Sequence, residues 1–317
     1  MTTPRRIVSL LSSATEILYA LGLGDRVAAV SHECDYPPAA LRKPKVTFSH
    51  VQSAASSGAI DQQVRSLSEA GLPLYQIDVE LLSALRPELI VTQAQCDVCS
   101  VRYADVLAAV AAQPALRNTT VLALNPQSLS DILADIERVG VAAGCPDRAA
   151  EVIEKLSARV ARVRDATAGL SESERPRVAC IEWIEPLMLA ANWVPEIVEL
   201  AGGKNLLSQA GLHSTYTAWP DVAELDPQCI LIMPCGFDLA RTIAESAALA
   251  RLPGWNDLSA VRGSRVFAVD GSAYFNRSGP RIVDSLEILA HLIHPDRFDP
   301  PRGVDANAAW RLLVIGS

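Results

Sequence analysis

The strongest constraint on the fold is an alternation of short apolar runs with segments of helical periodicity. The run Ile7–Leu11 predicts a strand, and the capping-box spacing Ser13-Ala-Thr-Glu16 predicts the start of a helix that continues over Ile17–Leu23 and ends at Gly24. The same alternation continues as far as residue 144. Strands that alternate with helices form parallel sheets with helices on both faces, so this part is predicted to be an α/β lobe.

The other elements of this lobe follow from the same two patterns. Strands are predicted at Arg26–Val30, Lys45–Thr47, Glu88–Thr92 and Thr120–Leu124. Helices are predicted at Ala59–Ala70, Val79–Leu85, Val101–Ala112 and Leu129–Gly144.

A longer helical pattern runs from Pro146 to Leu170. Ile153, Leu156, Val160 and Val163 recur at helical spacing with charged residues between them, and Pro146 suits the first turn of a helix. The polar stretch of residues 171–176 then ends the pattern. A long helix between two α/β parts predicts an interdomain spacer.

The second half of the chain repeats the alternation. Strands are predicted at Arg177–Trp183, Cys229–Met233 and Arg265–Val269, and helices at Val194–Ala201, Val222–Leu225, Leu239–Ala250 and Pro280–Leu292. We therefore predict an N-terminal α/β lobe over residues 1–145, a linking helix over 146–170 and a C-terminal α/β lobe over 171–317. The tail from Asp305 to Ser317 is expected either to add a strand or to pack on a lobe.

Composition narrows the classes of partner. With 317 residues and 50% hydrophobic content the chain can bury two cores. A net charge of −8 argues against nucleic acid or an anionic membrane surface as the main partner. No apolar run reaches the length of about 18 residues that spans a bilayer, and no signal peptide is recognised, so we expect no membrane insertion and a cytoplasmic location. The seven cysteines are then expected to be thiols or ligands rather than disulfides.

Two predicted strands run directly into loops that carry cysteine. Cys96 and Cys99 follow the strand Glu88–Thr92, and Cys34 follows the strand Arg26–Val30. The carboxyl edge of a parallel sheet is where open α/β folds bind ligands. The three thiols suit a shared zinc or iron–sulfur site, and Cys96 and Cys99 also suit a reversible disulfide. The alternative is that they are small residues that pack within tight turns.

Several segments stand in the order and spacing of one family. They are Arg6–Leu10 with Ser13–Gly22, the loop Asp35-Tyr36-Pro37-Pro38, the run Leu85–Val91, and the block from Pro253 to Arg281. The chain resembles the class III substrate-binding proteins, which deliver iron chelates and cobalamin to ABC importers, and its Asp-Tyr-Pro-Pro loop resembles that of the cobalamin-binding branch. The resemblance implies two Rossmann-like lobes joined by one long helix, a ligand cleft between the lobes, and an ABC importer as partner.

The resemblance also implies where a ligand would be held. In that family aromatic side chains from loops of both lobes pack on the corrin ring; Tyr36 lies in the matching loop, Phe48 near a family aromatic, and Tyr274-Phe275 at a frequent aromatic pair. This chain departs from the pattern by carrying His32, Glu33 and Cys34 ahead of the matching loop. With the polar and aromatic residues that follow other predicted strands, the expected ligand-binding residues are His32, Glu33, Cys34, Tyr36, Phe48, Gln95, Cys96, Trp183, Trp193, His213, Tyr216, Cys235, Tyr274, Phe275 and Arg277.

Two functions of different classes remain open. The first is a binding protein that holds cobalamin or a related metal chelate, with thiols or His32 in contact with the metal. The second is a cytosolic metalloprotein whose own zinc or iron–sulfur centre is built by Cys34, Cys96 and Cys99. The sequence contains no phosphate-binding glycine loop, no Gly-x-Ser-x-Gly and no His-Glu-x-x-His, so it gives no strong sign of an enzyme.

The variant Cys96→Ser separates these two functions. A metalloprotein should lose its metal outright, because a thiolate ligand is removed, whereas a chelate carrier should keep cobalamin with weakened affinity at most. Elemental analysis and the ultraviolet–visible spectrum of anaerobically purified protein, before and after cobalamin is added, make the measurement. Stoichiometric zinc or iron that disappears in the variant would contradict the chelate carrier.

Overall fold

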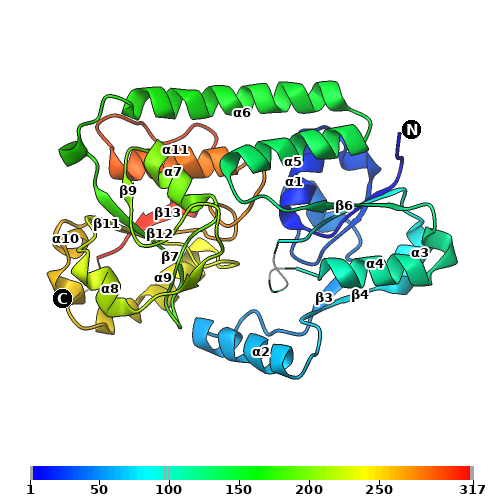
Figure 1. The fold of residues 1–317 in the computed structure, drawn as a ribbon, viewed down its shortest axis with the longest axis horizontal. Coiled ribbons are helices and arrows are strands. Elements are labelled where there is room, and N and C mark those ends of the chain that lie inside the picture. The colour runs from blue at the N-terminus through cyan, green and yellow to red at the C-terminus, as the bar shows by residue number, and fades with distance from the viewer. Residues whose placement is uncertain (1–2, 96–97, 99, 315–317) are drawn as a thin grey trace. The chain divides into compact units, whose positions relative to one another are not determined.

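The computed structural model describes residues 3–95, 98 and 100–314, and it divides into two compact units. Unit 1 comprises the residues up to 55, 59–126 and 130–155, and unit 2 comprises residues 56–58, 127–129 and those from 156 onward. The long helix α6 (Pro146–Thr167) contributes its first part to unit 1 and the remainder to unit 2 (Figure 1).

Unit 1 is organised around a parallel four-stranded sheet with the strand order β2-β1-β5-β6. Its strands are β1 (Ile7–Ser9), β2 (Val27–Val30), β5 (Leu89–Gln93) and β6 (Thr120–Leu124). All positions of β1 and β5 are buried, as expected where helices cover both faces of a parallel sheet. A separate antiparallel pair is formed by β3 (Thr47–Ser49) and β4 (Tyr75–Ile77).

The helices of unit 1 connect these strands. They are α1 (Ser12–Ala20), α2 (Ser57–Glu69), α3 (Val79–Leu85), α4 (Tyr103–Ala112) and α5 (Leu129–Ala142), with short 3-10 helices η1 (Gly24–Arg26), η2 (Pro38–Arg42) and η3 (Pro114–Leu116). Val8, Ile90 and Val106 are among the fully buried residues that form the core of this unit. The core therefore lies between the sheet and the helices that pack on it (Figure 1).

Unit 2 has a mixed seven-stranded sheet in the order β10-β8-β7-β11-β12-β13, with β9 paired to β7. The central strands β7, β11 and β12 are parallel, while β8, β10 and β13 run antiparallel to their neighbours. The bounds are β7 (Arg177–Trp183), β8 (Met188–Leu189), β9 (Lys204–Asn205), β10 (Thr215–Tyr216), β11 (Cys229–Ile232), β12 (Val266–Val269) and β13 (Trp310–Leu312). Of the two alternatives predicted for the tail, the structure shows the added strand, since β13 pairs with β12.

The helices of unit 2 enclose a second core. They are α7 (Val194–Leu200), α8 (Trp219–Glu224), α9 (Leu239–Ser246), α10 (Ser259–Arg262), α11 (Ile282–Ile293) and α12 (Ala306–Ala309), with 3-10 helices η4 (Glu172–Glu174), η5 (Leu249–Arg251) and η6 (Trp255–Asp257). Trp219 and Trp255 are buried in this core with their ring centroids 5.7 Å apart. Each unit therefore buries its own set of apolar side chains.

The predicted α/β class is confirmed, and one local prediction is wrong. Ser13 and Glu16 do not form a capping box, because α1 begins one residue earlier at Ser12, its N-cap is Leu11, and no side chain caps it. Both Ser13 and Glu16 lie inside the helix and are buried. The helix therefore begins one residue before the predicted cap, and Ser13 and Glu16 occupy interior positions of it.

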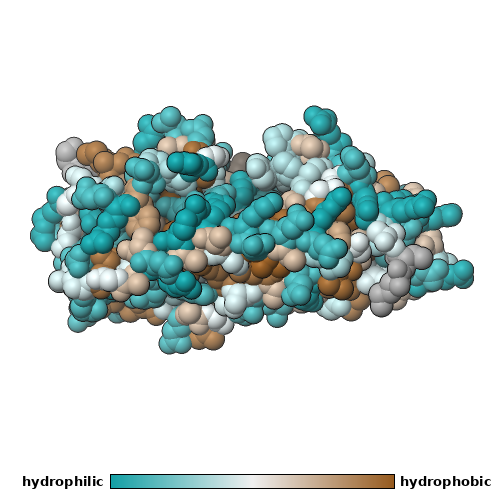
Figure 2. Space-filling model, turned by 90° about the horizontal axis from the view of Figure 1, so that it is seen from above, coloured by the Kyte–Doolittle hydropathy of each residue, from teal (hydrophilic) through white to brown (hydrophobic). Residues whose placement is uncertain are grey.

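The helix α6 is amphipathic, as its sequence predicts. Leu156 and Val163 are buried, while most of its charged residues are exposed or half-buried. In unit 1 the Arg148 guanidinium donates to the Leu21 carbonyl oxygen at 3.2 Å. In the view from above, Figure 2 shows hydrophilic side chains gathered over much of the surface, with hydrophobic atoms between them.

In unit 2 the helix α6 is held by one arginine. Arg159 donates from Nε and Nη2 to the two carboxylate oxygens of Glu287 at 3.0 and 2.7 Å, and from Nη2 to Asp284 at 2.5 Å. Burial raises the pKa of the Asp284 carboxyl, and the contact with Arg159 opposes that rise. The guanidinium therefore pairs with two partly buried carboxylates of α11.

We expect Arg159→Ala to destabilise unit 2 by about 2 kcal/mol, because two partly buried carboxylates lose their common partner. The matched control on the same helix is Arg164→Ala, whose partner Asp165 is exposed, and its effect should stay below about 1 kcal/mol. Urea unfolding followed by circular dichroism measures both. Equal losses of stability in the two variants would show that the Arg159 contacts carry no special weight.

Candidate functional site

The first loop of interest, residues 31–38, leaves the carboxyl end of β2. In the sheet this strand lies beside β1, whose end leads into α1. The Ser31 amide donates to the Ser9 carbonyl oxygen at 2.8 Å, and the Ser12 hydroxyl donates to the Glu33 carbonyl oxygen at 3.1 Å. The first loop is therefore anchored on the junction between β1 and α1.

The second loop, residues 94–100, leaves the carboxyl end of β5 on the other side of β1. The Tyr75 hydroxyl donates to the Val98 carbonyl oxygen at 2.8 Å, and the Tyr75 ring lies 5.5 Å from the His32 ring, centroid to centroid. Tyr75 thus contacts both loops. The predicted ligands Cys96 and Cys99 belong to this loop and lie outside the described residues.

His32 is held by a buried threonine at the start of β3. Both its amide and its ring Nδ1 lie close to Thr47 Oγ1, at 2.9 and 2.7 Å. Burial lowers the pKa of His32, and the nearby Lys45 ammonium lowers it further. At neutral pH the imidazole is therefore uncharged, and its Nε2 lies 3.9 Å from the Glu33 carboxylate.

The Cys34 thiol faces the core. Its side chain is 1% exposed, and the Thr15 hydroxyl lies 3.0 Å from its sulfur. Within residues 3–95, 98 and 100–314, no three His, Cys, Asp or Glu side chains are gathered closely enough to hold a metal ion. The prediction that Cys34 meets a ligand or metal does not fit this packing, because the sulfur fills a buried space beside α1.

Two aromatic side chains of unit 1 remain open to solvent. Tyr36 in the first loop is 44% exposed, and Phe48 in β3 is 51% exposed. Side chains alternate between the two faces of a strand, so Phe48 points outward while the preceding Thr47 is buried. Both aromatics therefore belong to unit 1, one in the His32 loop and one in β3, and a ligand has access to both.

In unit 2 the carboxyl ends of β7 and β11 carry further candidates. The Trp183 ring is half-buried against Phe237, with the centroids 5.3 Å apart, and the Arg241 guanidinium lies 3.5 Å from the Phe237 ring centroid. Cys235 is exposed at the end of β11. An added Cβ at Gly271 would lie 2.3 Å from the Pro234 carbonyl oxygen, so the loop after β12 can approach the end of β11 only with glycine there.

Trp193 and Phe275 are corrections to the predicted ligand set. They are 6% and 0% exposed, and the Trp193 indole N–H donates to the Phe275 carbonyl oxygen at 2.6 Å. Phe275 has a left-handed backbone with φ of 59°, and its amide donates to the Ser285 hydroxyl at 2.9 Å. These aromatics stabilise the loop after β12 from inside, so their rings are not presented to a ligand.

The other predicted residues are distributed as follows. Arg277 is buried and donates to the Ser272 hydroxyl at 3.3 Å, and the Tyr274 ring lies 5.5 Å below the Arg281 guanidinium. Gln95 is half-buried, while Glu33, His213 and Tyr216 are exposed. Their contacts with a ligand stay predictions.

Sequence reasoning missed three polar residues: Thr47 and Tyr75, which begin β3 and β4, and Glu182 near the end of β7. Thr47 and Tyr75 were not singled out, although they fix His32. In unit 2, burial raises the pKa of the Glu182 carboxyl near the end of β7, where the Ser214 hydroxyl donates to it. The available signal for Glu182 was a carboxylate within an apolar strand, while Thr47 and Tyr75 carry no local signal of their role.

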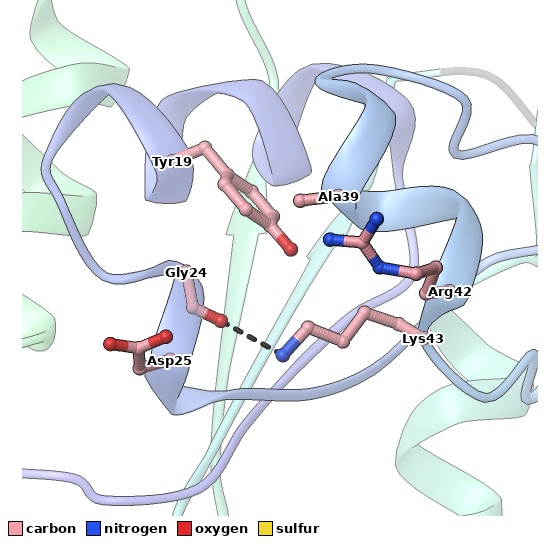
Figure 3. Close-up of a pocket in the computed structure, with 6 residues that line it drawn as sticks. All are labelled: Tyr19, Gly24, Asp25, Ala39, Arg42 and Lys43. Atoms are coloured by element: carbon pink, nitrogen blue, oxygen red, sulfur yellow. Dashed lines mark hydrogen bonds between the residues drawn. The ribbon is translucent and has the colours of Figure 1, made fainter.

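Two open pockets lie at the opposite ends of the strands. In unit 1 a pocket of about 300 Å³ is lined by Tyr19, Arg42 and Lys43 next to η1, which directly precedes β2 (Figure 3). Lys43 Nζ donates to the Gly24 carbonyl oxygen at 3.0 Å in this pocket. In unit 2 a pocket of about 520 Å³ lies beside Arg265, just ahead of β12. Neither pocket includes the predicted ligand residues.

Comparison with known proteins identifies the class. Residues 7–273 match the periplasmic binding protein family. The uncharacterized ABC transporter substrate-binding lipoprotein YvrC of Bacillus subtilis is 26% identical over 93% of this chain and 82% of its own length. The vitamin B12-binding protein of Yersinia pestis is 26% identical over 72% of this chain and 69% of its own length.

Solved structures share the fold. The vitamin B12-binding protein BtuF of Vibrio cholerae has a TM-score of 0.65 at 24% identity and covers 92% of this chain and 98% of its own. A periplasmic heme-binding protein of Pseudomonas aeruginosa has a TM-score of 0.70 at 20% identity, with 96% of each chain covered. This chain therefore shares its fold with these two periplasmic binding proteins.

The chain belongs to the periplasmic binding protein family. The family assignment confirms the resemblance read from the sequence, and it supports a ligand-binding role.

The loop after β12 gives a prediction for stability. Ser285→Ala should destabilise unit 2 by about 1–3 kcal/mol, because the Phe275 amide would stay buried without its acceptor while Phe275 keeps an unfavourable backbone conformation. Thermal and urea unfolding make the measurement, with the exposed Ser68→Ala in α2 as control. A Ser285→Ala protein as stable as the wild type would contradict this role.

Proposed function

We propose that this protein binds cobalamin or a closely related metal chelate with the loops at the carboxyl ends of its strands. The observation that carries the proposal is the placement of exposed Tyr36 and Phe48 together with His32 on unit 1. A family relative and a solved structure of the same fold are named as vitamin B12-binding proteins, which supports this ligand class.

The chemistry of such a ligand matches these side chains. A corrin or porphyrin ring is broad and flat with apolar faces, and aromatic side chains that cover such faces contribute most of the affinity. Phe48 and Tyr36 are both about half exposed, so each has apolar area left to bury. Burial of about 50–100 Å² per ring contributes about 1–2 kcal/mol at roughly 25 cal/mol per Å².

An ABC importer is the proposed partner. The relative from Bacillus subtilis is named as an ABC transporter substrate-binding lipoprotein. In the part of the chain that the structure describes, no helix is both long and apolar enough to cross a bilayer. A cytoplasmic location, as expected from the sequence, would keep the protein from ligand on the outer side of a membrane, so cell fractionation tests the location and the transport role together.

We expect Phe48→Ala to weaken binding of cyanocobalamin about tenfold, because about 1.4 kcal/mol of apolar burial is lost. Tyr36→Ala should have a similar effect. The matched control is Leu72→Ala, an equally exposed apolar residue of unit 1 that lies in the turn after α2. Isothermal titration calorimetry of purified protein makes the measurement.

Two outcomes would contradict the proposal. If cyanocobalamin, aquocobalamin and ferric haem all fail to bind the wild type, the ligand class is wrong. If Phe48→Ala and Tyr36→Ala bind cyanocobalamin as tightly as the wild type and the Leu72→Ala control do, the exposed aromatics are not part of the binding surface.

A further inference from the structure

The hydrogen bonds around His32 favour one of the two tautomers of its ring. The Thr47 hydroxyl donates its single proton to Ser31 Oγ, at 3.2 Å. Thr47 Oγ1 can therefore only accept from the two His32 groups that face it, the amide at 2.9 Å and Nδ1 at 2.7 Å. This arrangement favours the tautomer that carries its proton on Nδ1 and keeps a lone pair on Nε2.

The ring is also fixed in orientation. Thr47 is buried at the start of β3. The start of this strand is fixed to β2 because the Val46 amide donates to the Val30 carbonyl oxygen at 3.0 Å. The Tyr75 ring lies beside the imidazole at 5.5 Å between centroids, and Tyr75 is in turn bonded to Val98. The imidazole is thus held by a strand and by an aromatic neighbour, rather than by its own loop alone.

A histidine whose Nδ1–H donates to a fixed oxygen is the usual form of a metal-ligating histidine. The oxygen that accepts this hydrogen bond orients the ring, fixes the tautomer and makes Nε2 a stronger electron-pair donor to a metal. Here Thr47 Oγ1 supplies that oxygen, and the Glu33 carboxylate at 3.9 Å adds negative charge near Nε2.

We propose that His32 Nε2 is an axial ligand to the metal of the bound chelate. The inference rests on the proposed function, since the metal arrives with the ligand. It identifies His32 as the residue that selects chelates with an exchangeable axial position, such as the cobalt of a corrinoid whose upper ligand is water. In the binding step the metal–water bond breaks, water leaves, and the Nε2 lone pair forms the new bond; no electron or proton is transferred.

The selectivity follows from ligand exchange. Aquocobalamin offers an exchangeable water, whereas cyanocobalamin holds cyanide on the same face and offers no open position. His32 should therefore strengthen binding of aquocobalamin and leave cyanocobalamin binding to the aromatic contacts. Ferric haem also has exchangeable axial positions, and the same titration with haem distinguishes the two sources of metal.

The experiment is an absorbance titration of each ligand with the full-length protein. With wild type, the near-ultraviolet band of aquocobalamin should shift to the position given by free imidazole, and cyanocobalamin should bind without a shift. His32→Ala should abolish the shift and weaken aquocobalamin binding at least about tenfold, a larger loss than the same variant shows for cyanocobalamin. Added imidazole should restore the shifted band in this variant.

Two further variants separate coordination from folding. Thr47→Val removes the oxygen that orients His32 and should weaken aquocobalamin binding about 10- to 100-fold, whereas Thr47→Ser keeps a hydroxyl and should restore most of it. His50→Ala changes an exposed histidine of the same unit and should leave the band shift intact. Retained cyanocobalamin binding shows that each variant is folded.

The outcomes are distinguishable. If the wild type binds cyanocobalamin but leaves the aquocobalamin spectrum unshifted, or if His32→Ala keeps the shift, axial coordination by His32 is overturned and the proposed function stands. If ferric haem alone gives a His32-dependent shift, the metal ligand is confirmed and the chelate is a porphyrin. If no chelate binds the wild type, both the function and the inference fall.

Discussion

The parallel pairing of β1 with β2 on one side and β5 on the other is the constraint on which the candidate site depends. Parallel strands end at the same edge, so the loops after β2 and β5 emerge side by side, and the junction between β1 and α1 lies between them. Ser9 and Leu10 accept hydrogen bonds from the two loops at this junction. A shift in this pairing would move His32 and Val98 apart.

Hydrogen bonds at this edge of the sheet fix the orientation of the His32 ring. The hydroxyls of Ser31 and Thr47 and the imidazole of His32 form a largely buried hydrogen-bonded network, which leaves little freedom for the ring. The apolar contribution is separate, because the Tyr36 and Phe48 side chains are about half exposed to solvent. In the proposed complex the hydrogen-bonded network would orient His32, while the exposed rings would supply apolar area to the ligand.

The sequence predicted most of the regular elements, because their signals are local. The bounds of α3, β6 and β7 agree with the prediction, and α6 begins at the predicted Pro146. The short strands β4, β8, β9 and β10 were not predicted, since two or three residues carry too little periodicity. The exposure of side chains was harder to predict than the elements. Trp193 and Phe275 resembled ligand residues in sequence, but both are buried, and they are joined by a hydrogen bond across 82 positions of the chain.

The C-terminal strand β13 has a consequence for how the protein behaves among copies of itself. It pairs with β12, and it ends the sheet of unit 2 on that side. A long bare strand at this border would offer unpaired amide and carbonyl groups to any passing chain. β13 is only three residues long and carries Arg311 at its centre, so the border it creates is a poor template for intermolecular β-pairing. A short edge strand with a charged side chain at its centre therefore disfavours edge-to-edge pairing between copies of this protein.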